Sequence, residues 1–194
     1  MPKLNEPVIP LGDFARRKQP ILEVDDLVLR PWDLTDVPVV VQAYQDPAIM
    51  QWHGKTMTID DAKEWALHWP TRWQDESGAG WAISRGGEAI GQISLRRIDL
   101  DNGSGEFSYW ILPQGRGANV APKALSELST WAFGSAGFHR LELAHSVNNP
   151  ASCRVAHKSG YPAEGVKRQQ VRHADGWHDM HTHARLATDP DPVA

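Results

Sequence analysis

The turn at residues 116–119, Arg-Gly-Ala-Asn, has the residue types best suited to binding an anion. It follows an extended segment, 105–112, and precedes a helical pattern whose apolar positions are Ala121, Leu125, Leu128 and Ala132. A strand that enters a helix through a glycine-containing turn leaves several backbone N–H groups unpaired at the positive end of the helix dipole. We therefore predict that this turn binds a phosphate or pyrophosphate group.

Four histidines near the end of the chain raise the question of a metal site: His173, His178, His181 and His183. On a strand, His181 and His183 share a face while His178 points away. No neighbouring cysteine or paired carboxylate completes a ligand set in the sequence. We expect exposed hairpin histidines and no metal, and we expect the single cysteine, Cys153, to be a small buried residue.

Composition sets the broad class of the protein. The 194 residues are 41% apolar and 23% charged, which is typical of one soluble globular domain. No apolar run reaches the length of a membrane span, and the first residues lack the apolar core of a signal peptide. With a single cysteine, this indicates a cytoplasmic protein without a disulfide framework. The net charge of −4 disfavours a nucleic-acid partner, and no membrane partner is expected.

The elements that position the turn follow from periodicity and turn residues. We expect an irregular N-terminal arm over 1–25, one domain over 26–188, and a disordered tail over 189–194. Strands are predicted at 27–30, 80–85, 88–98, 105–112, 139–147, 161–173 and 177–187, and helices at 37–44, 59–69, 120–133 and 150–159. This order predicts an α/β (α+β) fold with a single mixed, mostly antiparallel sheet of about seven strands and about four helices.

Several motifs, in this order along the chain, resemble one known family. They are Leu29-Arg30-Pro31-Trp32 with Asp46-Pro47; Glu106-Phe-Ser-Tyr109-Trp110; Arg116-Gly117-Ala118-Asn119-Val120-Ala121; His139-Arg140-Leu141-Glu142-Leu143; and Asn149-Pro-Ala-Ser152 with Lys158-Ser-Gly160-Tyr161. Together they are similar to the GNAT superfamily of acyl-CoA N-acyltransferases, in its ribosomal-protein N-terminal acetyltransferase (RimJ/RimL-type) branch. The resemblance covers roughly residues 27–187.

This resemblance implies a GNAT domain whose sheet has a V-shaped splay, and acetyl-CoA as the donor. The pyrophosphate would meet backbone N–H groups of Gly117, Ala118, Asn119, Val120 and Ala121. The pantetheine arm would pair with Trp110, Ile111, Leu112 and Asn149, and the cations Arg116, Arg154 and Lys158 would meet phosphates. The family usually has glycine where this chain has Asn119. Asparagine tolerates a left-handed conformation, so the turn survives, but its side chain takes space near the phosphates.

Direct transfer from a thioester to an amine needs a base for the amine and a proton for the leaving thiolate. Glu106 is a candidate base acting through water, or else an exposed strand carboxylate. Ser152 is a candidate proton donor, or else a helix cap. Tyr109 and Tyr161 are alternative donors, although Tyr161 occupies a position that favours the core.

The acceptor side is expected near the first helices. Trp52 and His53, predicted in a loop before the second long helix, and Tyr109 are candidates for substrate contact, whereas Trp65 and Trp69 are expected in the core.

We predict an acetyl-CoA-dependent N-acetyltransferase that acts by direct transfer in a ternary complex. The acceptor would be a protein N-terminal α-amine or a small-molecule amine. Two alternatives stay open: a donor with a longer acyl group, such as succinyl-CoA, and a non-catalytic CoA-binding or sensor module. The resembling branch also implies a possible homodimer.

Overall fold

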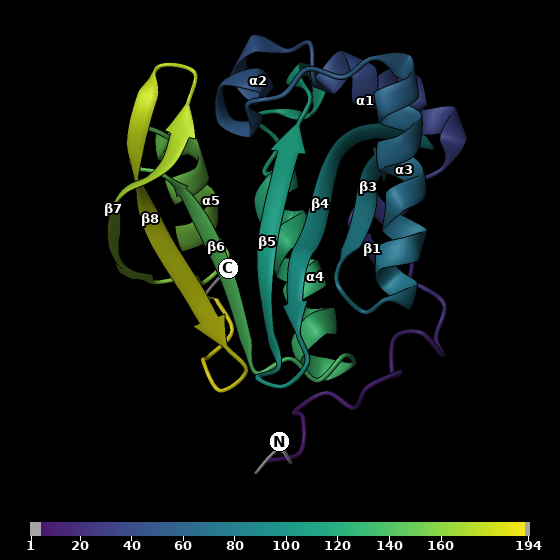
Figure 1. The fold of residues 1–194 in the computed structure, drawn as a ribbon, viewed down its shortest axis with the longest axis vertical. Coiled ribbons are helices and arrows are strands. Elements are labelled where there is room, and N and C mark those ends of the chain that lie inside the picture. The colour runs from purple at the N-terminus through teal and green to yellow at the C-terminus, as the bar shows by residue number, and fades with distance from the viewer. Residues whose placement is uncertain (1–4, 193–194) are drawn as a thin grey trace.

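The computed structural model describes residues 5–192 and shows one mixed sheet of eight strands, in the order β1-β2-β3-β4-β5-β6-β8-β7 (Figure 1). The strands are β1 (Leu22–Val24), β2 (Leu27–Pro31), β3 (Ala79–Arg85), β4 (Glu88–Asp99), β5 (Ser104–Ile111), β6 (Arg140–Ser146), β7 (Ala163–His173) and β8 (Gly176–Leu186). The helices are α1 (Val37–Ala43), α2 (Pro47–His53), α3 (Ile59–Gln74), α4 (Val120–Gly134) and α5 (Pro150–Lys158). The predicted fold class is therefore confirmed.

Helices cover both faces of the sheet, and the two-residue period of its strands separates two apolar clusters. On β3, Trp81 and Ile83 belong to the cluster that contains the buried face of α4. The residue between them, Ala82, belongs to the cluster formed with α1 and α3. Trp69 is buried in this second cluster, with Trp65 packed against it, as expected from their spacing.

The strands β5 and β6 pair over only half of their length. They are parallel, and residues 104–107 lie opposite residues 140–143. Beyond this point β6 continues to pair with β8 up to Ser146, whereas β5 continues to pair with β4 up to Ile111. The two halves of the sheet thus separate, as Figure 1 shows, and this confirms the predicted V-shaped splay.

Two elements were not predicted, which is why the sheet has eight strands rather than about seven and the structure has five helices rather than about four. The strand β1 has three residues, too few for a periodic pattern. The helix α2 begins at Pro47, directly after Asp46, whose side chain accepts a hydrogen bond from the backbone N–H of Ile49 at 3.0 Å. Asp46-Pro47 therefore starts a second helix as well as ending the first.

The helix α3 continues through Pro70 to Gln74, beyond residue 69, at which the predicted helix ends. Trp73, past the proline, is buried. The N-terminal segment packs on this end of the helix: the carboxylate of Glu76 accepts hydrogen bonds from the backbone N–H groups of Gly12 (2.6 Å) and Phe14 (2.8 Å). Phe14 itself is buried.

At the other end of the chain, Asp191 pairs with Arg185 at 2.8 Å, and residues 193–194 of the predicted tail lie outside the described residues. Among residues 5–192, no helix is both long and apolar enough to cross a membrane.

Candidate active site

A cleft of about 650 Å³ opens where β5 and β6 separate. Its walls come from α2, the end of β5, the turn before α4, the helix α5, the end of β6 and parts of β7 and β8. Most residues predicted for the site line it: Trp52, His53, Tyr109, Trp110, Ile111, Arg116, Gly117, Asn119, Val120, Ala121, Asn149, Ser152, Arg154 and Lys158. Three do not: Leu112 is fully buried in the core, Ala118 is exposed on the turn, and Glu106 lies elsewhere.

The turn at the mouth of the cleft requires two left-handed residues. Gly117 has φ of 84° and Asn119 has φ of 54°, so the expected left-handed conformation of Asn119 is confirmed. A Cβ at Gly117 would meet nothing within 4 Å, so the glycine is needed for its backbone angle rather than for space. Asn119 is the N-cap of α4 and makes no side-chain cap hydrogen bond. The backbone N–H groups of the first turn therefore have no capping side chain.

The side chain of Asn119 connects the turn to α5. Its Oδ1 accepts a hydrogen bond from Nζ of Lys158 at 2.8 Å. Both residues line the cleft, and Lys158 is exposed. The asparagine thus accepts one of the hydrogen bonds that the ammonium group of Lys158 could otherwise donate to an anion.

The side chain of Arg116 makes its polar contacts within the protein. Its Nε donates to the backbone oxygen of Ile111 at 3.0 Å, and its guanidinium lies 2.7 Å from Oδ1 of Asp46. Burial of Asp46 opposes its ionisation, but hydrogen bonds from Arg116 and from the backbone of Ile49 hold its pKa below the usual value. Arg116 therefore fastens the start of α2 to the end of β5.

Two hydroxyl groups meet inside the cleft. The phenolic oxygen of Tyr109 on β5 lies 2.7 Å from Oγ of Ser152 on α5. The N-cap of α5 is Asn149, whose Oδ1 accepts from the backbone N–H of Ser152 at 3.0 Å. The alternative role of Ser152 as the helix cap is therefore wrong, and its hydroxyl contacts Tyr109 instead. Burial raises the pKa of Tyr109 to about 12, so its O–H stays protonated.

Tyr161 does not take part in the cleft. It is fully buried, and its hydroxyl lies 2.6 Å from Oγ of Ser129 on α4. Burial raises the pKa of Tyr161 well above its usual value. The expectation that Tyr161 belongs to the core is confirmed.

The part of the cleft formed by the end of α2 is aromatic. Trp52 and His53 lie on α2, in a helix rather than in the predicted loop. Burial lowers the pKa of His53 to about 4, and a hydrogen bond with the backbone of Tyr109 offsets this only in part. The ring of Trp52 packs edge-on against His173, with centroids 5.7 Å apart. Among the described residues that line the cleft, there is no aspartate or glutamate.

Glu106 lies outside this cleft. Its carboxylate pairs with Arg96, which does line the cleft, and lies 3.5 Å from the guanidinium of Arg97. It borders a separate hollow beside Ser104 and Glu142. Because one of its oxygens pairs with Arg96 and the other faces Arg97, Glu106 is poorly placed to take a proton from an amine inside the cleft.

Among the lining residues that the sequence did not predict are three with basic side chains: Arg96, His145 and His173. Arg96 and Glu106 meet because β4 and β5 are neighbours with a register shift between Leu95 and Arg97. A β-bulge of this kind leaves no signal in the sequence pattern.

The four C-terminal histidines fall into two groups. His173 and His178 have ring centroids 4.5 Å apart and lie beside Trp52. His181 and His183 lie beside His145 and Cys153. The expectation that these histidines are exposed is wrong, because His178 is 5% and His183 1% exposed. Cys153, expected to be buried, is partly exposed.

Comparison with known proteins agrees with this geometry. The family model described as "Acetyltransferase (GNAT) domain" matches residues 26–162. The ribosomal-protein-serine acetyltransferase of Escherichia coli (strain K12) is 27% identical in an alignment that covers 79% of this chain and 98% of that protein. The uncharacterized N-acetyltransferase YoaA of Bacillus subtilis (strain 168) is 27% identical over 78% of this chain and 88% of its own length.

Solved structures share the fold. A RimL ribosomal L7/L12 alpha-N-protein acetyltransferase in complex with coenzyme A has a TM-score of 0.81, with 21% identity over 86% of this chain and 98% of its own. Mycobacterium smegmatis RimJ in complex with CoA-disulfide has a TM-score of 0.79, with 18% identity over 89% of this chain and 90% of its own. The resemblance seen in the motifs is confirmed, and the chain belongs to the family of GNAT acetyltransferases.

Proposed function

We propose that this acetyltransferase binds acetyl-CoA in the cleft between β5 and β6 and transfers the acetyl group directly to a primary amine. The observation that carries the proposal is the Tyr109–Ser152 hydroxyl pair, which lies inside the cleft between the unpaired end of β5 and the start of α5. The likeness to proteins solved with coenzyme A supports the choice of donor.

Three parts of the protein contact successive parts of acetyl-CoA. The left-handed turn at Gly117 and Asn119 and the start of α4 meet the pyrophosphate through backbone N–H groups. Arg154 and Lys158 on α5 supply positive charge near the phosphates. The backbone of β5 after Phe107 pairs with no residue of β6. The polar groups of this edge that Arg116 and His53 do not engage are available to the amides of the pantetheine arm.

In the transfer step, the lone pair of the amine forms a bond to the carbonyl carbon and the carbon–sulfur bond breaks. We assign Tyr109 as the donor in its hydrogen bond with Oγ of Ser152, which directs the hydrogen of Ser152 toward the leaving thiolate. Ser152 gives this proton to the sulfur and regains one from water. His53 is neutral at pH 7 and accepts a hydrogen bond from the attacking amine, whose proton leaves through water. Glu106 acts by positioning Arg96 at the cleft.

The acceptor we favour is the N-terminal α-amine of a peptide or protein. Polyamines and aminoglycosides carry several positive charges and need carboxylates to bind them, whereas the described lining of the cleft has none and includes Arg96, Arg154 and Lys158. An amine flanked by neutral or acidic residues suits this lining better. The named activities of the Escherichia coli relative and of the RimL structure agree with this choice.

The test is thiol release from acetyl-CoA with a panel of amines. We expect turnover with a peptide that has a free N-terminus followed by acidic residues, a gain of one acetyl group by mass spectrometry, and no turnover with the same peptide blocked at its N-terminus. Spermidine and an aminoglycoside are expected to react much more slowly. Binding of acetyl-CoA without thiol release from any amine would instead indicate a non-catalytic module, and faster reaction with succinyl-CoA would overturn the choice of donor.

A further inference from the structure

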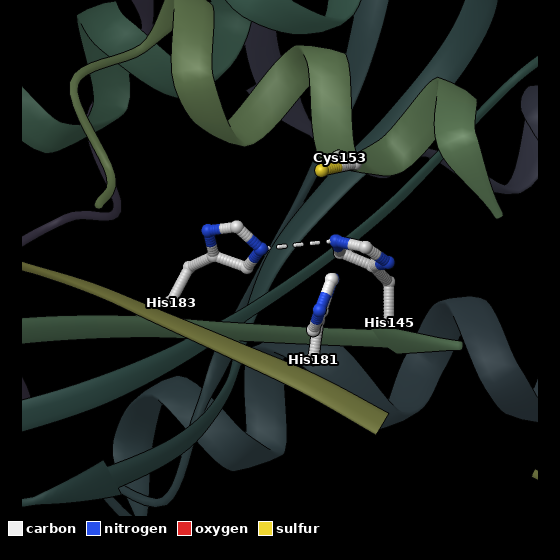
Figure 2. A group of neighbouring side chains, drawn as sticks. All are labelled: His145, Cys153, His181 and His183. Carbon is white, nitrogen blue, oxygen red and sulfur yellow. Dashed lines mark hydrogen bonds between the residues drawn. The ribbon is translucent and has the colours of Figure 1, made fainter. Parts of the chain in front are cut away.

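Four potential metal ligands from three elements meet between α5 and the strands β6 and β8: His145, Cys153, His181 and His183 (Figure 2). One ligand atom from each lies within 4.8 Å of those from the others. His145 comes from β6, His181 and His183 come from β8, and Cys153 points toward them from α5. We call these four residues the His3Cys cluster.

The sheet geometry brings the histidines together. His181 and His183 are two residues apart on β8, so they point to the same face of the sheet. His145 lies directly opposite His181 in the antiparallel pairing of β6 with β8. The helix α5 covers this face and adds the thiol (Figure 2). The donor atoms therefore come from segments that are separate in sequence and meet only in the folded protein.

The hydrogen bonds of two rings fix which nitrogen faces the cluster. Nδ1 of His145 lies 2.8 Å from the backbone oxygen of Ser146, and Nδ1 of His183 lies 3.0 Å from the backbone oxygen of Tyr161. A carbonyl oxygen only accepts, so each Nδ1 carries the hydrogen. In the neutral rings, both Nε2 atoms then present lone pairs, and these two atoms are 3.1 Å apart.

Two lone pairs at this distance repel each other unless a cation lies between them, either a proton or a metal ion. A proton would satisfy only these two nitrogens, whereas a metal ion would also take the donor atoms of His181 and Cys153, which lie within 4.8 Å of them. In addition, Nδ1 of His181 is buried and has no hydrogen-bond partner among the described residues. A buried nitrogen without a partner is costly, and metal coordination satisfies it.

We propose that the His3Cys cluster binds one divalent transition-metal ion, with Zn²⁺ as the best match. Three imidazole nitrogens and one thiolate form a complete tetrahedral donor set for zinc, and backbone oxygens that hold the opposite ring nitrogens are typical of metal-binding histidines. The softer donors exclude Mg²⁺ and Ca²⁺, which prefer oxygen. When the thiolate binds, the thiol proton is released to solvent.

The fit requires only a small adjustment of the side chains. Zn–N bonds of about 2.0–2.1 Å and Zn–S bonds of about 2.3 Å place tetrahedral ligand atoms roughly 3.3–3.8 Å apart. The two Nε2 atoms of His145 and His183 are already at 3.1 Å, and the largest separation in the cluster is at most 4.8 Å. Cys153 is only partly buried, so its side chain has room to rotate about its Cα–Cβ bond and adjust the position of the sulfur.

A bound ion would fasten α5 to β6 and β8. The same helix carries Ser152, which lines the cleft together with the N-cap residue Asn149, and His145 also lines it. The metal therefore has a structural role: it holds α5, which forms part of the active-site cleft, against the sheet. Metal binding at the His3Cys cluster does not depend on which amine the enzyme acetylates.

The test uses the full chain after removal of metals with a chelator, and Co²⁺ as the probe. Cobalt in a tetrahedral site with a thiolate ligand gives visible d–d bands and a near-ultraviolet thiolate-to-metal charge-transfer band. We expect both sets of bands to saturate at one Co²⁺ per chain, and added Zn²⁺ to abolish them by displacement. Zn²⁺ alone should raise the Tm of the protein, because an ion that binds only the folded state stabilises it.

Two variants and one control locate the ion. Cys153→Ser should lose the charge-transfer band and the rise in Tm, while circular dichroism shows that it folds. His181→Asn should weaken Co²⁺ binding at least tenfold. The matched control is His157→Gln, which removes an exposed histidine of α5 that packs beside His183 but is not a member of the cluster, and it should keep both signals. The proposal is overturned if the wild type gives no such bands, or if Cys153→Ser keeps them unchanged.

Discussion

The phenolic oxygen of Tyr109 on β5 and Oγ of Ser152 on α5 lie 2.7 Å apart, across the opening between the two halves of the sheet. A second tyrosine–serine pair, Tyr161 with Ser129, has a similar separation of 2.6 Å but is buried in the core under α4. The protein thus contains two equivalent hydroxyl pairs, and only one faces the cleft. This difference makes the second pair an internal control for the chemistry of the first.

Ser152→Ala should lower kcat about a hundredfold, because general acid catalysis contributes on this scale. Tyr109→Phe should lower kcat less, since Ser152 keeps its own hydrogen. The KM for acetyl-CoA should change little in either variant. Tyr161→Phe should instead cost about 1 kcal/mol of stability and leave kcat unchanged. Steady-state kinetics and thermal melts check these values, and an unchanged kcat in Ser152→Ala would remove this residue from the mechanism.

Gly117→Ala should raise the KM for acetyl-CoA, because a residue with Cβ at φ of 84° costs roughly 1–2 kcal/mol and the turn relaxes away from the phosphate-binding shape. The matched control is Gly134→Ala at the end of α4, where the backbone angle is not in the left-handed region and the added Cβ also meets nothing within 4 Å. The control should keep its KM. Equal effects in both variants would show that the left-handed turn does not hold the cofactor.

Asn119→Gly should lower the KM for acetyl-CoA, because it releases Nζ of Lys158 from Oδ1 of Asn119 and clears space at the turn. Lys158→Met should raise this KM. In the double variant, Asn119→Gly should no longer lower the KM, because the lysine that it would release is absent. The effects of the two substitutions on the KM are therefore expected to be non-additive. Strict additivity of the two free-energy changes would mean that Lys158 does not bind the donor.

The stability of the protein should decrease as the pH falls from 6.5 toward 4. The pKa of His53 is about 4 in the folded protein, against an ordinary value of 6.5 for an exposed histidine. Below pH 6.5 the unfolded state therefore binds a proton that the folded state excludes. Burial also lowers the pKa of His173, which adds in the same direction.

Chemical denaturation at a series of pH values measures this slope. His53→Gln should make the slope shallower between pH 6.5 and 4, because one of the contributing groups is gone. The matched control is His68→Gln, on the outer face of α3, which should leave the slope unchanged. A slope that His53→Gln leaves unaltered would contradict the burial of this ring in its neutral form.

The sequence alone was sufficient for the features that depend on local chemistry. The predicted strands 80–85 and 88–98 are separated by Gly86 and Gly87, which have positive φ in the hairpin between β3 and β4. The glycine-containing turn before α4 was located because Gly117 and Asn119 are residue types that tolerate left-handed angles. The motifs around them were enough to place the chain in its family, and the order of strands and helices was enough for the class of fold.

Tertiary structure decided which side chains meet. Glu106 lies outside the cleft and pairs with Arg96 because of a register shift between β4 and β5, and a register is not encoded in the pattern of a single strand. His145, Cys153, His181 and His183 come together because β6 pairs with β8 and α5 packs over them, although the sequence grouped the histidines of β7 and β8 instead. Contacts between distant segments depend on the order of the strands, on their register and on the separation of β5 from β6. These are properties of the whole fold.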